Sequence, residues 1–168
     1  MVVLFRWLFR AVVALLALGL LLFALAWWFA ARSLPNYEGT FAVQGITAPV
    51  EIVRDHSAVP HVFGATDADV FFALGYAHAQ DRLWQMTMLR RTAQGRLSEL
   101  FGERTLPIDR LMRRLDLYGL ATRAVEAQDE PTREALDAYS AGVNAWLGEV
   151  NAGARGRGAP EMWIARAA

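Results

Sequence analysis

In the stretch GYAHAQDRLWQM, positions 75–86, four polar or charged residues lie within five positions: His78, Gln80, Asp81 and Arg82. Histidine and aspartate at this spacing can transfer protons or bind a metal ion. The surrounding residues are mostly Phe, Leu, Tyr, Trp and Met, so charged side chains buried among them are costly unless each one is paired. The stretch is therefore either a catalytic site or part of a buried scaffold.

A metal site is the first catalytic alternative. His61, His78 and Asp81 provide two imidazoles and one carboxylate, a set that binds iron in many oxygenases. His78 and Asp81 are three residues apart, which places them on one face of a helix. Residues of such common types often match this pattern by chance, so the metal site is the less favoured interpretation.

A serine nucleophile is the second alternative. Ser57, Ser98 or Ser140 would have to be activated by a histidine and an aspartate. None of the three serines lies in a G-x-S-x-G elbow, the turn that exposes such a nucleophile in many hydrolases. This alternative is also less favoured.

The favoured interpretation is a structural polar network that fixes a helix against a sheet. Its members are the polar residues of the stretch and one nearby histidine: His61, His78, Gln80, Asp81 and Arg82. Asp81 and Arg82 are adjacent and point to different sides of a helix, so each needs its own partner. The candidate partners are Gln85, Arg90, Arg91 and backbone groups of another element. This interpretation gives no residue a catalytic, cofactor-binding or metal-binding role.

The element that carries these residues is predicted to be a helix from about Asp67 to about Ala93. Thr66 can cap it, and Asp69 three residues later resembles the acidic residue of a capping box. The first half is apolar around most of its circumference, which is typical of a central, buried helix. Gly75 inside the helix costs roughly 1 kcal/mol relative to Ala unless another element packs closely there.

A β-hairpin is predicted just before this helix. VEIVRD, 50–55, and VPHVFG, 59–64, are rich in β-branched residues, and residues 55–58 join them. TFAVQG, 40–45, is a candidate first strand. A lone pair of strands is marginally stable in water and has edges that need partners, so the predicted sheet is incomplete.

Helical segments are predicted after this long helix, at 95–102, 107–115, 120–128 and 131–150. The last of them has an apolar face at helical spacing. The arginines of this region are interleaved with acidic residues, Asp109 among them, which predicts a solvated face with ion pairs.

The N-terminus contains a predicted membrane span. Residues 11–31 carry no charge and as a helix would extend over roughly 32 Å, compared with roughly 30 Å of bilayer core. Trp27 and Trp28 lie near the far end, where an aromatic belt is expected. Arg6 and Arg10 before the span favour an N-terminus in the cytoplasm.

An uncleaved anchor is favoured over a cleaved signal peptide. Ala24-Leu25-Ala26 offers a small-x-small cleavage site, but cleavage there would leave WWFAA as an apolar new N-terminus. We therefore expect a single-pass protein of the bacterial inner membrane, with its C-terminal part on the periplasmic or extracellular side.

Composition excludes several other kinds of chemistry. All 17 basic residues are Arg, and the 168 residues contain no Lys and no Cys. A Schiff base, a P-loop, a thiol nucleophile and cysteine-bound zinc are therefore excluded for this chain. The 17 acidic residues balance the basic ones, so no broad attraction to nucleic acid is expected.

Several motifs occur in a specific order between Pro49 and Trp146: VEIVRD-x4-PHVFG, DADVFFALGYAHAQDRLWQM, GRLSELFG, DRLMRRL and AYSAGVNAWL. This combination resembles the penicillin acylase family of N-terminal-nucleophile amidohydrolases, which includes cephalosporin acylases and acyl-homoserine-lactone acylases. One departure is Ala58, where the family commonly has Gly before the x-P-H turn. A left-handed conformation there would cost Ala more than Gly.

The predicted elements give an α+β fold class: an N-terminal transmembrane helix, a β-hairpin and a mainly helical segment. The resemblance implies that they form part of an incomplete αββα fold of an N-terminal-nucleophile hydrolase. Together, the pattern and the resemblance divide the chain into four parts. These are a membrane anchor or uncleaved signal, 1–32; a linker and first strand, 33–48; a penicillin-acylase-like α region, 49–150; and a divergent tail, 151–168.

In this family, a precursor cleaves itself into an α and a β chain. The first residue of the β chain, usually Ser, is the nucleophile, and its own α-amino group is the base. Donors in the β chain form the oxyanion hole. Calcium binds between the chains of the complete enzyme, with one α-chain carboxylate beyond the part matched here. Glu161 lies in a different context, APEMWIARAA, so the resemblance gives this chain no catalytic or metal-binding residue.

We therefore expect a fragment of an acylase that hydrolyses linear amide C–N bonds through an acyl-enzyme on a β-chain serine absent here. Its substrates would be of the penicillin, cephalosporin or acyl-homoserine-lactone type. Its expected partners are the membrane, the remainder of the α region and the β chain. A frameshift, an early stop or a fragmentary gene model would each produce the divergent tail. The alternative is a non-catalytic, membrane-anchored helical protein that binds a partner, or a decayed gene product.

Overall fold

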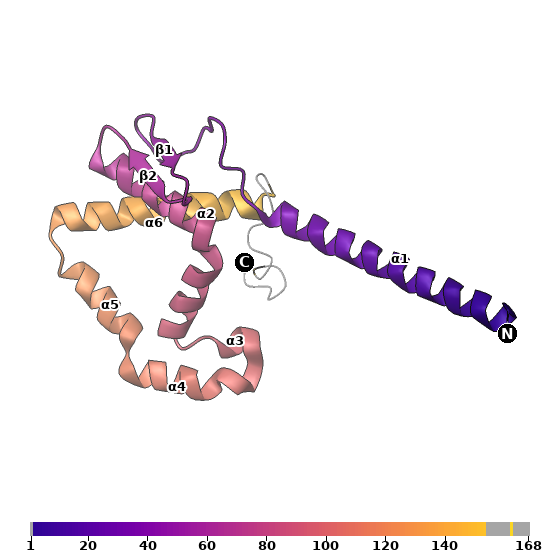
Figure 1. Ribbon diagram of the computed structural model, residues 1–168. Coiled ribbons are helices and arrows are strands. Elements are labelled where there is room, and N and C mark those ends of the chain that lie inside the picture. The colour runs from indigo at the N-terminus through magenta and orange to yellow at the C-terminus, as the bar shows by residue number, and fades with distance from the viewer. Residues whose placement is uncertain (1, 154–161, 163–168) are drawn as a thin grey trace.

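The computed structural model describes residues 2–153 and 162. The elements in chain order are α1 (Val2–Ser33), β1 (Glu51–Arg54), β2 (Pro60–Phe63), α2 (Asp67–Ala93), α3 (Ser98–Phe101), the 3-10 turn η1 (Gly102–Thr105), α4 (Leu106–Leu115), α5 (Leu117–Glu126) and α6 (Glu130–Asn151). The hairpin lies against α2, and α3, α4 and α5 form an arch that joins the end of α2 to the start of α6 (Figure 1). Most of the predicted divergent tail, with Glu161, lies outside the described residues.

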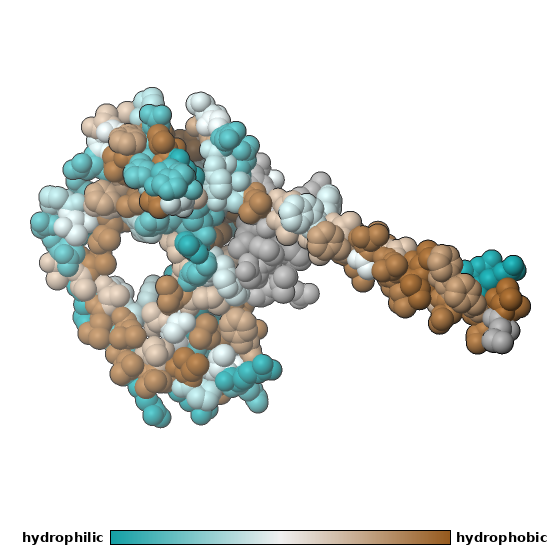
Figure 2. Space-filling view, viewed as in Figure 1, coloured by the Kyte–Doolittle hydropathy of each residue, from teal (hydrophilic) through white to brown (hydrophobic). Residues whose placement is uncertain are grey.

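The N-terminal helix α1 projects away from the rest of the chain, and apolar side chains cover it along its length (Figure 2). Val2–Ala31 has a mean hydropathy of 2.6 in its most apolar part and is not buried against the other elements, so it is a candidate membrane span. The guanidinium of Arg10 lies 5.8 Å from the centre of the Trp7 ring at one end. Trp28 and Phe29 make an edge-to-face contact at the other end.

The core is the contact between α2 and α6. Tyr76, Ala79 and Leu83 of α2 are buried against Trp146 and Val150 of α6. The rings of Tyr76 and Trp146 meet edge to face with their centres 5.4 Å apart, a favoured geometry for an aromatic pair. The predicted bounds of α2 are confirmed, and Thr66 caps it by accepting a hydrogen bond from the Asp69 backbone N–H at 3.2 Å.

The helix α2 bends at Arg82, whose backbone angles, φ −139° and ψ 22°, are not helical. The bend turns the second half of α2 away from α6 and toward α3 (Figure 1). Without a proline in the stretch, the sequence predicted one continuous helix. The kink follows directly after Asp81, so the polar residues of the opening stretch lie where the helix changes direction.

The predicted hairpin is confirmed, with β1 and β2 antiparallel. Its loop is closed by Asp55, whose carboxylate accepts hydrogen bonds from the backbone N–H groups of Ser57 at 2.8 Å and Val59 at 3.0 Å. Ala58 has a φ of 60°. The alanine therefore adopts the left-handed conformation that suits glycine.

The predicted strand over residues 40–45 is wrong. Residues 40–43 have no regular structure, and Gln44 and Gly45 form a turn in which Gly45 has a φ of 107°. The sheet within the described residues has two strands only. A strand needs a neighbouring strand for its backbone hydrogen bonds. This segment instead packs on the core through Val43, and Thr47 just after it bonds to Asp69 of α2.

Candidate functional site

The polar residues singled out in the sequence lie in separate places. Asp81 and Gln80 face β1, His78 contacts α6, His61 lies on the hairpin, and Arg82 is exposed at the kink of α2. The structure therefore joins Asp81 and Gln80 in one cluster and keeps the other three apart from it.

The Asp81 cluster joins three elements. Asp81 Oδ2 forms an ion pair with Arg54 Nη1 at 2.9 Å, with side chains 23% and 14% exposed. The hydroxyl of Tyr37 donates to Asp81 Oδ1 at 3.0 Å, and Arg54 Nη2 donates to Gln80 Oε1 at 3.4 Å. The guanidinium of Arg54 also lies 4.0 Å from the centre of the Tyr37 ring. Burial and the neighbouring Asp81 carboxylate raise the pKa of Tyr37.

The partner of Asp81 is therefore not Gln85, Arg90 or Arg91. The hairpin lies across the first half of α2 and brings a cation from β1 to Asp81, whereas Arg91 lies beyond the kink and pairs with Glu99. Asp81 therefore connects α2 to β1 through Arg54 and to the segment before the hairpin through Tyr37.

The histidines do not meet Asp81. His78 Nδ1 lies 3.0 Å from the hydroxyl of Tyr139, and His61 Nε2 lies 3.4 Å from Asp55 Oδ2. Burial raises the pKa of Tyr139. Within residues 2–153 and 162, no group of three or more His, Cys, Asp or Glu side chains could hold a metal ion. The metal-site alternative therefore gains no support from the geometry.

The geometry does not support the alternative of a serine nucleophile either. The Ser57 backbone bonds to Asp55, that of Ser98 bonds to Asp109, and Ser140 is exposed on α6. Among the residues that the structure describes, no hydrogen bond joins a serine hydroxyl to a histidine ring.

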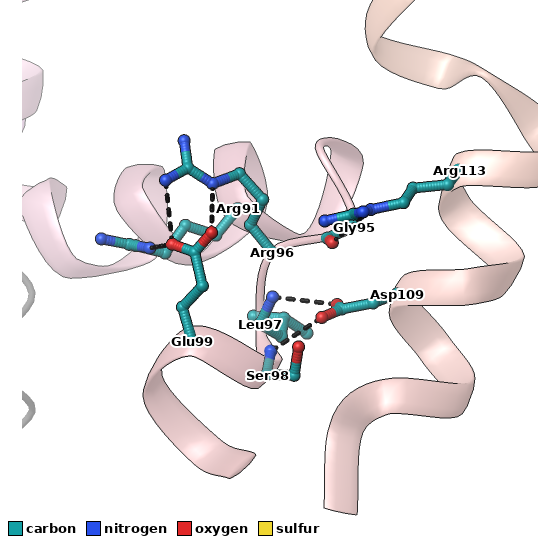
Figure 3. Close-up of polar contacts among 8 residues, drawn as sticks. All are labelled: Arg91, Gly95, Arg96, Leu97, Ser98, Glu99, Asp109 and Arg113. Atoms are coloured by element: carbon teal, nitrogen blue, oxygen red, sulfur yellow. Dashed lines mark hydrogen bonds and ion pairs between the residues drawn. The ribbon is translucent and has the colours of Figure 1, made fainter. Parts of the chain in front are cut away.

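A second polar cluster, which the sequence did not predict, lies where α4 meets the segment after α2 (Figure 3). Asp109, only 2% exposed, accepts hydrogen bonds from the backbone N–H groups of Leu97 at 2.9 Å and Ser98 at 2.8 Å. Arg113 Nε donates to the carbonyl oxygen of Gly95 at 2.9 Å. The predicted solvated face is thus wrong for Asp109, which caps α3 from another helix.

The start of α3 explains why Asp109 is bound there. The cap position of α3 is Leu97, which has no side-chain acceptor, so the first N–H groups of the helix need one from elsewhere. Burial acts to raise the pKa of Asp109, but the bonds from Ser98 and Leu97 and the charge of Arg113 outweigh it and hold the pKa below its ordinary value. The sequence signal that could have indicated such a partner is the apolar Leu97 at the cap position.

Glu99 completes this cluster. It accepts from Arg96 Nε at 2.6 Å and Nη2 at 2.9 Å, and from Arg91 Nη1 at 2.9 Å (Figure 3). The hydrogen bonds from Arg96 are the main cause of a lowered pKa of Glu99. Both arginines are therefore engaged within the chain, and the cluster fixes the segment after the kinked half of α2.

A groove of about 900 Å³ lies between residues 37–46, the hairpin and the first half of α2. Its lining combines polar groups with apolar side chains, which include Phe41, Ile52, Phe63 and Phe72. Arg54 and Gln80 of the Asp81 cluster lie at its wall. Both clusters join elements of the chain to one another: the Asp81 cluster joins β1 to α2, and the Asp109 cluster joins α4 to the start of α3.

Comparisons with known proteins agree on one family. The penicillin amidase family model matches residues 49–168, which includes the part that we expected to diverge. The chain is 42% identical over 115 residues to penicillin acylase 2 proenzyme of Pseudomonas sp. (strain SE83), covering 68% of this chain and 15% of that protein. It is 40% identical over 117 residues to acyl-homoserine lactone acylase QuiP of Pseudomonas aeruginosa, covering 70% of this chain and 14% of that protein.

A solved structure is also similar. Thermostable penicillin G acylase from Alcaligenes faecalis matches with a TM-score of 0.58 and 32% identity, over 64% of this chain and 57% of that chain. This chain spans about 15% of the length of the first curated relative and 13% of the next. The matched proteins therefore extend far beyond the segment seen here.

Proposed function

The chain belongs to the penicillin amidase family, and from this premise we propose that it is the N-terminal α-region part of a membrane-anchored acylase that hydrolyses linear amide bonds. The observation that carries the proposal is the family match over residues 49–168 combined with the small share of each relative that the chain covers. In the proposed complete enzyme, the nucleophile comes from a β chain outside this sequence.

The reaction proposed for the complete enzyme has two steps. The hydroxyl oxygen of a β-chain N-terminal serine attacks the amide carbonyl, the amine leaves with a proton, and the acyl group stays on the serine. Water then cleaves the ester and releases the acid. Substrates of the penicillin, cephalosporin or acyl-homoserine-lactone type fit this reaction, since relatives are named for two of them.

The role proposed for this chain is to position the groups that react. The Arg54–Asp81 ion pair holds the hairpin on α2, and Asp109 holds α4 against the start of α3. The described residues do not form a calcium site, so any calcium of the complete enzyme would need ligands from outside them, and we assign no step to it.

The first test concerns activity. Purified residues 33–168 should not release acid from phenylacetyl, glutaryl or long-chain acyl amides above background. The DNA downstream of codon 168 should continue, in frame or after a frameshift, with a Ser-Asn-type autocleavage site. Acyl release that scales with the concentration of this chain would contradict the proposal, and clean intergenic DNA would favour a stand-alone, non-catalytic protein that binds a partner.

The second test concerns the anchor. The candidate span Val2–Ala31, with Arg6 and Arg10 near its N-terminal end, supports a periplasmic or extracellular C-terminal part. A phosphatase fused after Val150 should be active in cells and stay with the membranes after a carbonate wash. A soluble fusion with no phosphatase activity would refute the anchored orientation, and a soluble, active one would indicate a cleaved signal.

A further inference from the structure

Residues 34–48, which connect α1 to the rest of the chain and which we call the strap, are bound to α2 at two points. Near one end, the hydroxyl of Tyr37 donates to Asp81 Oδ1 at 3.0 Å. Near the other end, Thr47 donates to the Asp69 carboxylate through its backbone N–H at 2.7 Å and its hydroxyl at 2.8 Å. The strap therefore runs along α2 over about 18 Å of helix.

The first contact point lies where three elements meet. Arg54 of β1 forms the ion pair with Asp81, stacks on the ring of Tyr37 at 4.0 Å, and donates to the carbonyl oxygen of Ala58 at 3.2 Å. We call this corner of the molecule the anchor corner; it consists of Tyr37, Arg54, Ala58 and Asp81. The hairpin loop around Ser57 belongs to the same corner, because Ala58 closes that loop.

The chain between the membrane helix and the anchor corner is short. The helix α1 ends at Ser33, so three residues separate it from Tyr37. A fully extended chain advances at most about 3.6 Å per residue, which keeps Tyr37 within about 14 Å of the end of α1. If Tyr37 were not bound, the chain would still be held at Val43, which packs against the core, and the reach from the end of α1 would grow to about 36 Å.

We infer that the anchor corner faces the phospholipid head groups, and that the contact of Tyr37 with Asp81 and Arg54 holds the folded unit close to the bilayer. This inference rests on the membrane anchoring proposed above. It gives the linker a defined function: the strap is a short, docked connection instead of a flexible tether. It also assigns the hairpin loop and the kinked side of α2 to the membrane-facing surface.

Energy transfer to lipid tests this inference on the complete 168-residue chain. Because the chain contains no Cys, Ser57→Cys introduces a unique site for a donor dye on the exposed hairpin loop. The protein is reconstituted in vesicles of phosphatidylcholine and phosphatidylglycerol that carry an acceptor dye on the head groups. We expect efficient transfer from position 57 in the otherwise unchanged chain.

Two further variants change the distance that the linker can span between α1 and the folded unit while leaving the fold itself unchanged. Six Gly and Ser residues inserted between Leu34 and Pro35 leave the Tyr37 contact in place but extend its reach from about 14 Å to about 36 Å, so transfer should fall markedly. Tyr37→Ala releases the first contact point and should also lower the transfer. Tyr37 is 45% exposed, so melting of this variant should stay near that of the parent.

The outcomes are distinct. Lower transfer in both variants supports the inference. If the chain floats with vesicles but transfer from position 57 is the same in all three proteins, the inference is overturned while the proposed anchoring stands. If the chain does not float with vesicles, the anchoring and the inference both fail. Should Tyr37→Ala melt early, the insertion variant alone decides.

Discussion

Gly75 of α2 and Gly142 of α6 lie at the same helix crossing, each against the backbone of the other helix. A Cβ atom on Gly75 would overlap the carbonyl oxygen of Tyr139, and one on Gly142 would overlap the carbonyl oxygen of Phe72. Both glycines are buried. The close approach explains why α2 contains a glycine in its interior despite the cost in helix stability.

Gly75→Ala and Gly142→Ala should therefore each destabilise the chain. A methyl group at either position pushes against backbone, which cannot rotate aside as a side chain can, and overpacking of this kind typically costs about 1–3 kcal/mol. Thermal unfolding followed by circular dichroism measures the change. Gly148→Ala is the matched control, because nothing lies within 4 Å of a Cβ there and Ala is the better helix former. If the three variants melt alike, the two helices are farther apart than described.

Ala58→Gly should stabilise the hairpin. Ala58 has a φ of 60°, and a left-handed conformation costs an L residue about 1–2 kcal/mol. Part of this gain is lost because glycine is more flexible in the unfolded chain, so the net gain should be about 0.5–1 kcal/mol. Urea unfolding at equal protein concentration measures it. Ser57→Gly in the same loop has no positive φ to relieve and should be neutral or destabilising, and a gain there equal to that of Ala58→Gly would contradict this explanation.

Stability should fall in acid because of carboxylates that accept hydrogen bonds in the folded chain. The bonds from Thr47 and Thr66 lower the pKa of Asp69, and the pKa of Asp109 is also lowered. A folded-state pKa below the unfolded value of about 3.9 means that the full contribution is present above about pH 4 and is lost as pH falls through the folded pKa.

The check is a series of melting curves between about pH 7 and pH 2. Asp109→Asn should lower the melting temperature near neutral pH and flatten its fall in acid, since one of the titrating groups is gone. Asp137→Asn, at an exposed position of α6, is the control and should follow the parent curve. An Asp109→Asn curve parallel to the parent at every pH would contradict the assignment.

The parts of the fold that sequence predicted are those decided by neighbouring residues. Thr66 and Asp69 mark the start of α2 whatever packs against it, and the β-branched runs around residues 55–58 form a hairpin through their own loop. Residues 40–45 have a strand-like composition but lack a partner strand. They lie along α2 instead, because pairing and packing decide strands more than composition does.

The contacts that could not be predicted from the sequence join residues that are distant in the chain. Arg54 and Asp81 are 27 residues apart, and Ser98 and Asp109 are 11 apart. Which arginine reaches which carboxylate depends on how the hairpin crosses α2 and how α4 folds back on α3. The kink at Arg82 could not be predicted from the sequence either, because neither a proline nor a glycine lies at that position.

Asp81→Asn distinguishes a scaffold role from a catalytic one. The substitution weakens the bond to Arg54 and leaves that guanidinium without its counter-charge. Loss of a fully buried pair costs about 3–5 kcal/mol, but these side chains are 23% and 14% exposed, so we expect a smaller cost of about 1–3 kcal/mol, as for hydrogen bonds to charged groups.

In a full-length acylase that carries this segment, less enzyme should mature, its melting temperature should fall, and turnover per mole of matured enzyme should be nearly normal. Arg82→Ala, the exposed neighbour, should match the parent in all three. A catalytic acid or base would give the opposite pattern: normal yield and melting, with turnover reduced by roughly 10²–10⁴.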